Sequence, residues 1–479
     1  MSCDDRGFGL SLGLLPFTRA RRLSQHVIQR YHMYSVDTTV DKQTLRSASI
    51  LGGACVTGPT VWLPGMQQEY TPWFPGNVAK VFNALERRGL DADHVGTKPG
   101  AVLTLSPFQS PLYKIFIQAC AEAGMDVDAL SREGFLASPR VGVVGRASVR
   151  VTPNGEAAST HLLWLDRALA DPTVSRHLTV ATDTRAVRLH LSGATAQGVA
   201  VVTKNGEAVT VPCGRVVLCA GALESPRLLQ LSGIGAPEAL KAAGISCVVA
   251  NADVGANLHD QVDSPVSARL TSQDCIAYLA ASSPAVQLGI RAEWEMRREG
   301  WGMSDFTDVV ALVKSTKCEG LVPDMALNFL PFGSDNSQPQ CSIVARVATP
   351  TSRGSVSLQS SDVMVPSRID LGHLMTETDK QVMAEAVAMA TQILGSKPFG
   401  SRLLGSSLLD GPPLSASQCG GTCALDKVVD GVSFKVKGTD NMYVCDSSVV
   451  PRPLLGGLGP AVVMLASQFG KVSTNTNTA

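Results

Sequence analysis

Glycines that follow apolar, strand-like runs are the positions with the clearest chemical use in this sequence. The run 215–220 (RVVLCA) has the composition of a strand buried on both faces, and it ends at Gly221. A strand that ends in Ala-Gly lets a ligand's phosphate or ribose approach the backbone, because glycine carries no side chain. An ordinary strand-to-helix turn fits the same pattern, so the residues alone leave both interpretations open.

A second glycine-rich turn lies near the end of the chain. Residues 454–459 (LLGGLG) precede the apolar segment 460–469, which is predicted to be a helix with Pro460 at its first position. Free backbone N–H groups and partial positive charge at a helix N-terminus can stabilise an anionic ligand. A plain helix that packs on a sheet would show the same pattern.

The dinucleotide fingerprint G-x-G-x-x-G does not occur in this sequence. Gly7, Gly9 and Gly13 come near it, but the spacing is wrong by one residue and no strand-like run precedes them. Gly233 and Gly235 lack the third glycine. The sequence therefore shows no complete strand–GxGxxG–helix unit.

Cysteine and histidine patterns do not indicate a metal site. The twelve cysteines form no C-x-x-C pair, and Cys419 and Cys423 have no second pair nearby. Free buried thiols are typical of a reducing compartment, which favours an intracellular location. Residues 6–35 are basic and contain no acid, so an organelle is also open.

The elements that must position these turns can be predicted coarsely. Residues 178–211 alternate as strands with an Asn205-Gly206 hairpin turn, 441–445 form a short strand, and 80–87 and 111–123 form helices. The run after Gly221 is predicted to be a helix to 231 with Pro226 in its first turn, and 377–394 is an amphipathic helix with Thr376 as its N-cap. Strand–loop–helix units separated by long stretches indicate a discontinuous α/β fold with an inserted domain.

Composition limits the class of partner. The chain has 479 residues, of which 44% are hydrophobic, and its 41 basic residues balance its 41 acidic residues. A nucleic-acid or anionic-membrane partner normally requires a basic face, so a small-molecule substrate is the expected partner. No apolar run reaches the roughly 18 residues of a membrane-spanning helix. The sequence does not indicate an oligomeric state.

Several segments together resemble the glucose–methanol–choline (GMC) family of FAD-dependent oxidoreductases. Residues 221–235 (GALESPRLLQLSGIG) are similar to the second family signature, and 253–260 (DVGANLHD) resemble the family's G-V-G-x-N-L-x-D loop. Residues 50–54 (ILGGA) resemble its L-G-G-S loop, 65–73 (GMQQEYTPW) its R-G-x-x-x-D-Y-x-x-W stretch, and 437–451 its C-terminal flavin-contacting strand.

This resemblance implies a two-domain α/β fold and FAD as cofactor. We expect a discontinuous FAD-binding domain with a parallel-sheet core at 1–75, 140–262 and 415–479. A substrate-binding domain with an antiparallel sheet and helices is expected at 76–139 and 263–414. The expected flavin contacts are Gly52, Gly53, Ala54, Ala186, Ala220, Gly221, Asp446, Ser447, Gly459 and Pro460.

The sequence also departs from the family pattern. The resemblance begins just after the family's N-terminal βαβ unit, so we expect the FAD-binding domain to lack that unit. The two family catalytic positions fall on Gln418 and Leu458, and neither side chain can act as a base. His259, in a flavin-side loop, is a third candidate, and a structural histidine is its simpler interpretation.

Three functional hypotheses follow from these matches and departures. The first is an oxidoreductase that acts on the CH–OH group of an alcohol-type or aldehyde-type donor by hydride transfer to flavin. The second is a non-catalytic or incomplete homologue that has lost the FAD fingerprint and the catalytic histidine pair. The third is a flavoprotein similar to the algal photodecarboxylases of the same family.

Overall fold

The computed structural model describes most of the chain after its first thirty residues. The described residues are 31–36, 43–48, 51–58, 60–74, 78–88, 101–105, 110–127, 142–150, 158–271, 275, 278, 283–297, 306–333, 338–400 and 402–475. The near-match at Gly7 to Gly13 and the basic segment before residue 31 lie outside them.

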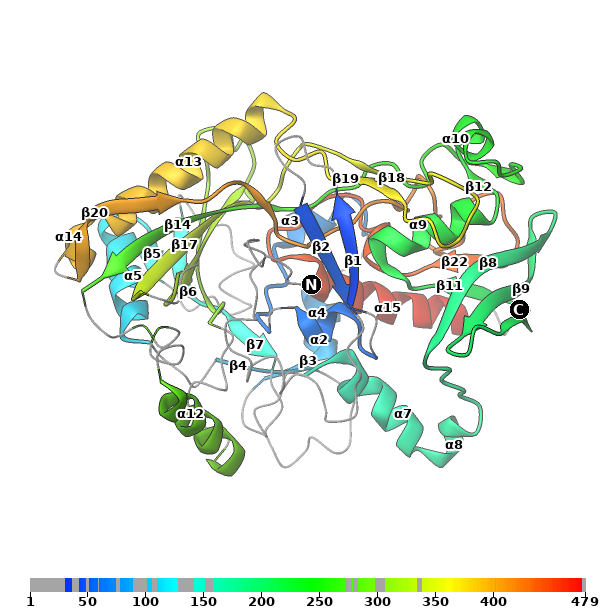
Figure 1. The fold of residues 1–479 in the computed structure, drawn as a ribbon, viewed down its shortest axis with the longest axis horizontal. Helices are drawn as coiled ribbons and strands as arrows, with labels where there is room; N and C mark the ends of the chain where they lie inside the picture. Colours follow the sequence, from blue (N-terminus) through cyan, green and yellow to red (C-terminus); the bar gives the residue numbers. More distant parts are fainter. Residues whose placement is uncertain are drawn as a thin grey trace.

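A large mixed sheet forms one side of the molecule, at the left in Figure 1. Its eight strands run in the order β20-β14-β17-β16-β15-β6-β5, and β21 pairs with β14. Every pair is antiparallel except β5 with β6. The strands are β5 Asp126–Val127, β6 Gly142–Arg146, β14 Val262–Leu270, β15 Val309–Val313, β16 Met325–Leu330, β17 Gln340–Val347, β20 Leu403–Asp410 and β21 Leu414–Ser415.

Helices cover one face of this sheet, and a glycine-rich turn meets the other. Helices α5 (Pro111–Glu122), α13 (Glu377–Leu394) and α14 (Lys397–Gly400) share a core with alternate residues of the strands. The residues between them, such as Leu312 and Ala326, pack instead with Leu63 and Leu455. The period of two along each strand thus directs one set of side chains to the helices and the other to the turn at 454–459.

The second side of the molecule contains the elements that carry the predicted ligand turns. Strand β11 (Val216–Leu218) pairs in parallel with β22 (Met442–Val444), and helices α9 (Gly221–Leu231) and α15 (Leu458–Asn475) pack beside them (Figure 1). Strands β8 (Thr184–Ser192), β9 (Thr195–Thr203) and β10 (Ala208–Pro212) form an antiparallel sheet. One buried cluster joins these elements with Trp62, Tyr70 and Leu163.

Of the remaining elements, several lie between or beside these two parts (Figure 1). The strands are β1 Tyr31–Val36, β2 Gln43–Ala48, β3 Glu86–Arg88, β4 Ala101–Leu105, β7 Ser148–Arg150, β12 Ile234–Gly235, β13 Val249–Ala250, β18 Ser355–Ser357 and β19 Arg368–Asp370. The α-helices are α2 Ala54–Thr57, α3 Gln67–Tyr70, α4 Val78–Leu85, α7 Asp166–Ala170, α8 Pro172–Ser175, α10 Pro237–Ala242 and α12 Pro284–Arg297. Shorter helical segments are the π-helix η3 His161–Leu165 and the 3-10 helix η5 Ser447–Val449.

Several predicted elements agree with the structure. Helix α13 has the predicted bounds, and the Thr376 side chain caps it by accepting from Asp379 N. Gly206 adopts φ 81° in the turn between β9 and β10, as the Asn-Gly signal predicts. Helix α5 ends one residue before Ala123, and Gly124 follows at φ 89°.

Other element predictions were wrong in detail. Helix α4 ends at Leu85, and residues 86–88 form a strand. Residues 178–183 precede β8 and are not part of it. Val217 is 37% exposed, so β11 is not buried on both faces. Both prolines predicted at the start of a helix lie further in, because α9 begins at Gly221 and α15 at Leu458.

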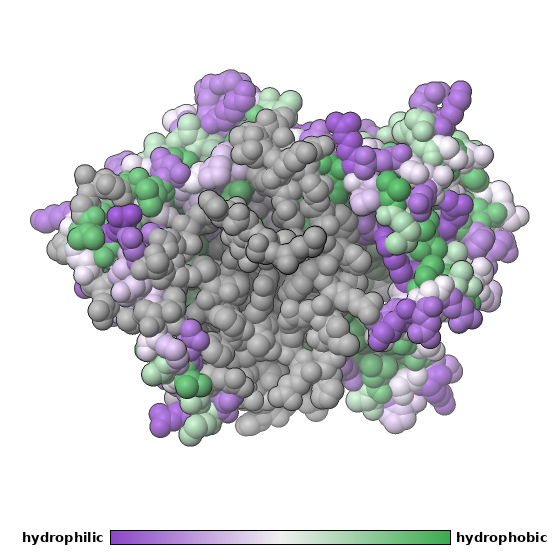
Figure 2. Space-filling model, in the orientation of Figure 1, coloured by the Kyte–Doolittle hydropathy of each residue, from purple (hydrophilic) through white to green (hydrophobic). Residues whose placement is uncertain are grey.

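The described surface mixes polar and apolar side chains. In Figure 2 hydrophilic groups lie at the upper edge of the face over α13 and α10, and apolar groups show among hydrophilic ones on the right-hand side. Among the described residues, no helix is both long enough and apolar enough to cross a membrane. In the part of the chain that the structure describes, eleven cysteines from Cys55 to Cys445 are free thiols, and five of these are buried.

Candidate functional site

The Asp446 carboxylate fixes the turn at Gly221 where β11 enters α9. Its Oδ2 atom accepts hydrogen bonds from Gly221 N at 2.8 Å and from the Ser225 hydroxyl at 2.5 Å. Its Oδ1 atom accepts from Ser448 N at 2.8 Å. Gly221 has φ 85°, a conformation that glycine adopts without strain, and a Cβ atom there would meet open space. The structure therefore brings two predicted cofactor residues together and leaves room beside them.

Helix α9 continues through Pro226 because a distant side chain replaces the hydrogen bond that proline cannot make. Proline has no N–H, so the carbonyl of Ala222, four residues earlier, loses its usual helical donor. The Thr422 hydroxyl donates to this carbonyl at 2.6 Å, and both Thr422 and Pro226 are buried. The Gly421-Thr422-Cys423 segment is thereby attached to the first turn of α9.

The two positions at which the resemblance places catalytic groups are in contact. Gln418 Oε1 accepts a hydrogen bond from Leu458 N, the first residue of α15, at 3.1 Å. The same amide group lies over Gly457, whose Cβ atom would be 3.1 Å from that oxygen. Leu458 is buried, with 5% of its surface exposed. The two catalytic positions of the family resemblance are thus adjacent in space, but neither the Gln418 nor the Leu458 side chain can accept a proton.

His259 and Leu458 both border Gly420, and the histidine ring is enclosed by glycines. Its Nε2 atom donates to Val450 O at 2.9 Å, and its ring packs against Gly420 and Gly421, where a Cβ atom would overlap it. A Cβ atom on Gly420 would also contact Leu458 Cδ1, at 2.9 Å. Burial lowers the pKa of His259 to about 4, so the imidazole is neutral at pH 7.

The segment 257–261 clamps the C-terminal elements to the large sheet. Asn257 Nδ2 donates to Gly421 O at 3.3 Å and to Pro451 O at 3.1 Å. Gln261 Nε2 donates to Leu454 O and to Ala348 O, both at 2.9 Å. Since β14 begins at the next residue, these bonds fix the sheet relative to the turn at 454–459.

Glu69 holds the segment 65–73 against that turn. Its carboxylate accepts from Met66 N and from Leu455 N, each at 2.7 Å, although Glu69 is only 3% exposed. Burial raises the pKa of Glu69 to about 7, against the lowering effect of the two backbone hydrogen bonds and of Arg452. Gly456 touches Leu63 so closely that a Cβ atom would overlap the Leu63 carbonyl oxygen.

The remaining predicted contact residues, apart from buried Pro460, are at least partly exposed. Gly52 and Gly53 have φ 88° and 55°; Thr160 donates to Gly52 O at 3.3 Å, and a Cβ on Gly53 would meet open space. Ala186 is an exposed residue of β8, paired with Val201. Ala54, the first residue of α2, is exposed, as is Ala220 beside Gly221. Ser447 is half-buried, and in α15 the exposed Gly459 precedes the buried Pro460.

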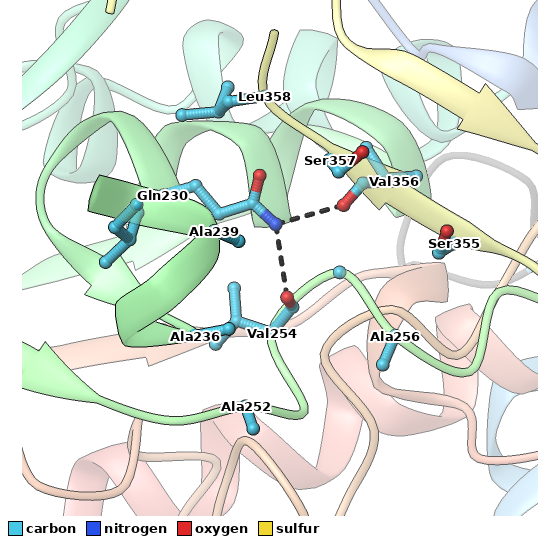
Figure 3. Close-up of a pocket in the computed structure, with 12 residues that line it drawn as sticks. Gln230, Ala236, Ala239, Ala252, Val254, Ala256, Ser355, Val356, Ser357 and Leu358 are labelled. Carbon is cyan, nitrogen blue, oxygen red and sulfur yellow. Dashed lines mark hydrogen bonds between the residues drawn. The ribbon is translucent and has the colours of Figure 1, made fainter. Parts of the chain in front are cut away.

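A cavity of about 150 Å³ lies elsewhere, between α9, α10 and β18 (Figure 3). The Gln230 amide nitrogen donates across its edge to Val254 O at 3.1 Å and to Val356 O at 3.0 Å. No predicted cofactor residue lines this cavity, and pockets for cofactor-sized ligands are several times larger, roughly 300–1,000 Å³. The cavity is therefore separate from the candidate site.

Two residues of the site had no role assigned from the sequence. Asp260 is 2% exposed and accepts from the backbone N of Gln418 at 2.7 Å, and Glu69 bonds Leu455 N as described. Both occupy matched motif positions, Asp260 ending the 253–260 loop and Glu69 standing where the 65–73 stretch is expected to have Asp. Their place in those motifs was the only signal for them in the sequence.

Comparison with known proteins gives a consistent result. Family models described as GMC oxidoreductase match residues 32–263 and 350–466. An oxygen-dependent choline dehydrogenase from Chromohalobacter salexigens is 27% identical over 461 residues, covering 88% of this chain and 79% of that protein. One from Staphylococcus haemolyticus is 28% identical over 405 residues, covering 77% of this chain and 67% of that protein.

Solved structures show the same fold at lower sequence identity. Pyridoxine 4-oxidase from Mesorbium loti has a TM-score of 0.74 at 22% identity, covering 96% of this chain and 90% of that one. A formate oxidase from Aspergillus oryzae has a TM-score of 0.81 at 18% identity, with the same coverage of each chain. At these identities the likeness concerns the fold alone.

Proposed function

The chain belongs to the GMC oxidoreductase family, and we propose that it is an FAD-dependent oxidoreductase that acts on the CH–OH group of a small-molecule donor. The observation that carries the proposal is the joining of turns that are far apart in the sequence. Gly221 is bonded to Asp446, 225 residues later, and Gln418 to Leu458 at the start of α15.

The described residues fit FAD at these turns. Gly53, Gly221 and Gly459 each have open space where a Cβ atom would stand, so a ligand can lie against the backbone there. We assign cofactor contacts to Gly52, Gly53, Ala54, Ala186, Ala220, Gly221, Asp446, Ser447, Gly459 and Pro460. The described part of the chain has no strand–GxGxxG–helix unit, so this fit rests on the other turns alone.

FAD, when bound, supplies the acceptor for a hydride from the donor carbon. The Oε1 atom of Gln418 is engaged with Leu458 N, so its Nε2 atom is the group that can donate to the donor's hydroxyl oxygen and orient it. Neither position 418 nor position 458 can accept the hydroxyl proton, which leaves to solvent. The missing base makes turnover roughly 10²–10⁴-fold slower than in a site that has one.

A non-catalytic homologue is the second candidate, and the environment of His259 favours it. This is the one imidazole that the sequence places in a flavin-side loop. It is buried, neutral, and committed through Nε2 to Val450 O. A site without a base can still hold a flavin for a structural or sensing role.

One experiment separates these candidates. The purified protein is scanned for flavin absorbance, and a flavin-bearing preparation is then mixed anaerobically with a panel of alcohols and aldehydes. Bleaching of the oxidised flavin by a member of the panel supports the proposed oxidoreductase. Retained colour with no bleaching supports the non-catalytic homologue, and a folded protein without flavin overturns the cofactor assignment.

A further inference from the structure

The loop that carries Gln418 is held by one buried carboxylate, that of Asp260. Oδ1 of Asp260 accepts from Gln418 N at 2.7 Å, and Oδ2 accepts from the Ser415 hydroxyl. His373 Nε2 lies 3.4 Å from the same Oδ2 atom, and both side chains are buried. Charge-assisted hydrogen bonds of this kind are about twice as strong as neutral ones.

The backbone of this loop is strained immediately before Gln418. Ser417 has φ 57°, which costs a residue other than glycine roughly 1–2 kcal/mol. Such conformations persist only where the surroundings enforce them. Here Ser417 N donates to Ser415 Oγ at 3.0 Å, and the next amide donates to Asp260. The carboxylate thus bonds Ser415, two residues before the strained one, and Gln418, the residue after it.

Asp260 is itself fixed on both sides along the chain. His259 N and O exchange hydrogen bonds with Gly420 O and N, each at 3.0 Å. Gln261 bonds the carbonyls of Leu454 and Ala348, and β14 starts at Val262. The carboxylate is therefore a rigid point from which the position of residue 418 is set.

From this arrangement we infer that Asp260 is a positioning residue, which sets the backbone of residue 418 so that its side chain lies on the N-terminus of α15. The Ser415 hydroxyl bonds the carboxylate in this orientation, and His373 packs beside it. The consequence for catalysis rests on the proposed function, because Gln418 is the group that would orient the donor hydroxyl. The consequence for the Gln418–Leu458 hydrogen bond does not require a flavin or a reaction.

The test uses hydrogen–deuterium exchange resolved at the Leu458 amide in the full chain. In Asp260→Ala we expect that amide to exchange about five-fold faster, since one net hydrogen bond is lost. Asp379→Ala is the matched control: Asp379 is 1% exposed and its carboxylate accepts from Thr351 N and Ser352 N, both at 2.8 Å. This control is expected to lose stability without a selective change at Leu458.

A milder variant keeps the test decisive if Asp260→Ala fails to fold. Ser415→Ala removes one donor to the carboxylate, and we expect a smaller increase at the same amide. Unchanged Leu458 exchange in a folded Asp260 or Ser415 variant overturns the inference, as does an equal increase in the Asp379 control. If the wild type turns over a donor, kcat should fall in these variants with little change in KM. A wild type without turnover counts only against the proposed function.

Discussion

Replacing Gln418 with His is the sharpest test of the chemistry assigned to this site. Gln418 occupies the position at which the family resemblance expects a histidine, and its side chain already reaches the N-terminus of α15. An imidazole at 418 would lie next to the same space and could accept the proton of a donor hydroxyl. Because Asp260 holds the backbone of residue 418, the new side chain starts from a fixed point.

The expected gain can be worked out from two opposing effects. A positioned base contributes about 10²–10⁴-fold, which corresponds to about 3–5 kcal/mol of the barrier. Losing the bond from Leu458 N costs about 1 kcal/mol, or roughly five-fold, if the imidazole does not replace it. The rate of flavin reduction should therefore rise at least about ten-fold in Gln418→His.

The assay is anaerobic reduction of the bound flavin by the best wild-type donor, measured across a range of pH. Only a neutral imidazole accepts a proton, so the gain should appear as the pH rises through the histidine pKa of about 6.5. Gln418→Leu, which cannot donate or accept a hydrogen bond, serves as the control and should be slower than wild type. Equal rates in wild type and Gln418→His, at equal flavin content and a pH well above that pKa, would refute the assignment.

Three further predictions concern stability and cofactor retention. The pKa of Glu69 is raised from 4.5 to about 7, so between these values the folded state keeps a proton that the unfolded state loses. The free energy of unfolding should therefore fall by about 3 kcal/mol as the pH rises from below 4.5 to above 7. Denaturant titrations should show that Glu69→Gln abolishes this pH dependence. Gly456→Ala, which would overlap Leu63 O, should cost at least about 1–3 kcal/mol by calorimetry, whereas Gly289→Ala in open space on α12 should be neutral or stabilising. Asp446→Asn places an N–H group where Gly221 N and the Ser225 hydroxyl now donate, so the free energy of unfolding should fall by about 1.5–3 kcal/mol. The flavin-to-protein ratio should fall as well, and an unchanged ratio would remove Asp446 from the cofactor site.

Local sequence patterns predicted the glycine turns of this site better than the long-range contacts that fix those turns in space. The glycines at 52, 53, 221 and 457 all take positive φ, as expected of turns that leave the backbone accessible. Their neighbours in space could not be predicted from local patterns. Asp260 meets Gln418 across 158 residues and Glu69 meets Leu455 across 386, and neither hydrophobic period nor turn chemistry carries such information.

The wrong helix starts have the same physical origin. Proline is usual in the first turn of a helix, and both helix predictions rested on that preference. In α9 the Asp446 carboxylate and the Ser225 hydroxyl stabilise a start at Gly221, five residues before Pro226. Tertiary contacts therefore outweigh a local preference, and the Thr422 hydroxyl supplies the hydrogen bond to Ala222 O that Pro226 cannot make.

Because the Thr422 hydroxyl replaces the amide that Pro226 lacks, substitutions at residues 226 and 422 should have non-additive effects on stability. With Pro226 in place, Thr422→Val leaves a buried carbonyl without a donor and should cost about 1–3 kcal/mol. Once position 226 regains an amide, as in Pro226→Ala, the helix can satisfy Ala222 O itself and the threonine becomes dispensable. Along an evolutionary path, losing the proline first avoids this loss of stability, so divergent descendants of this sequence should reach the double replacement mostly in that order.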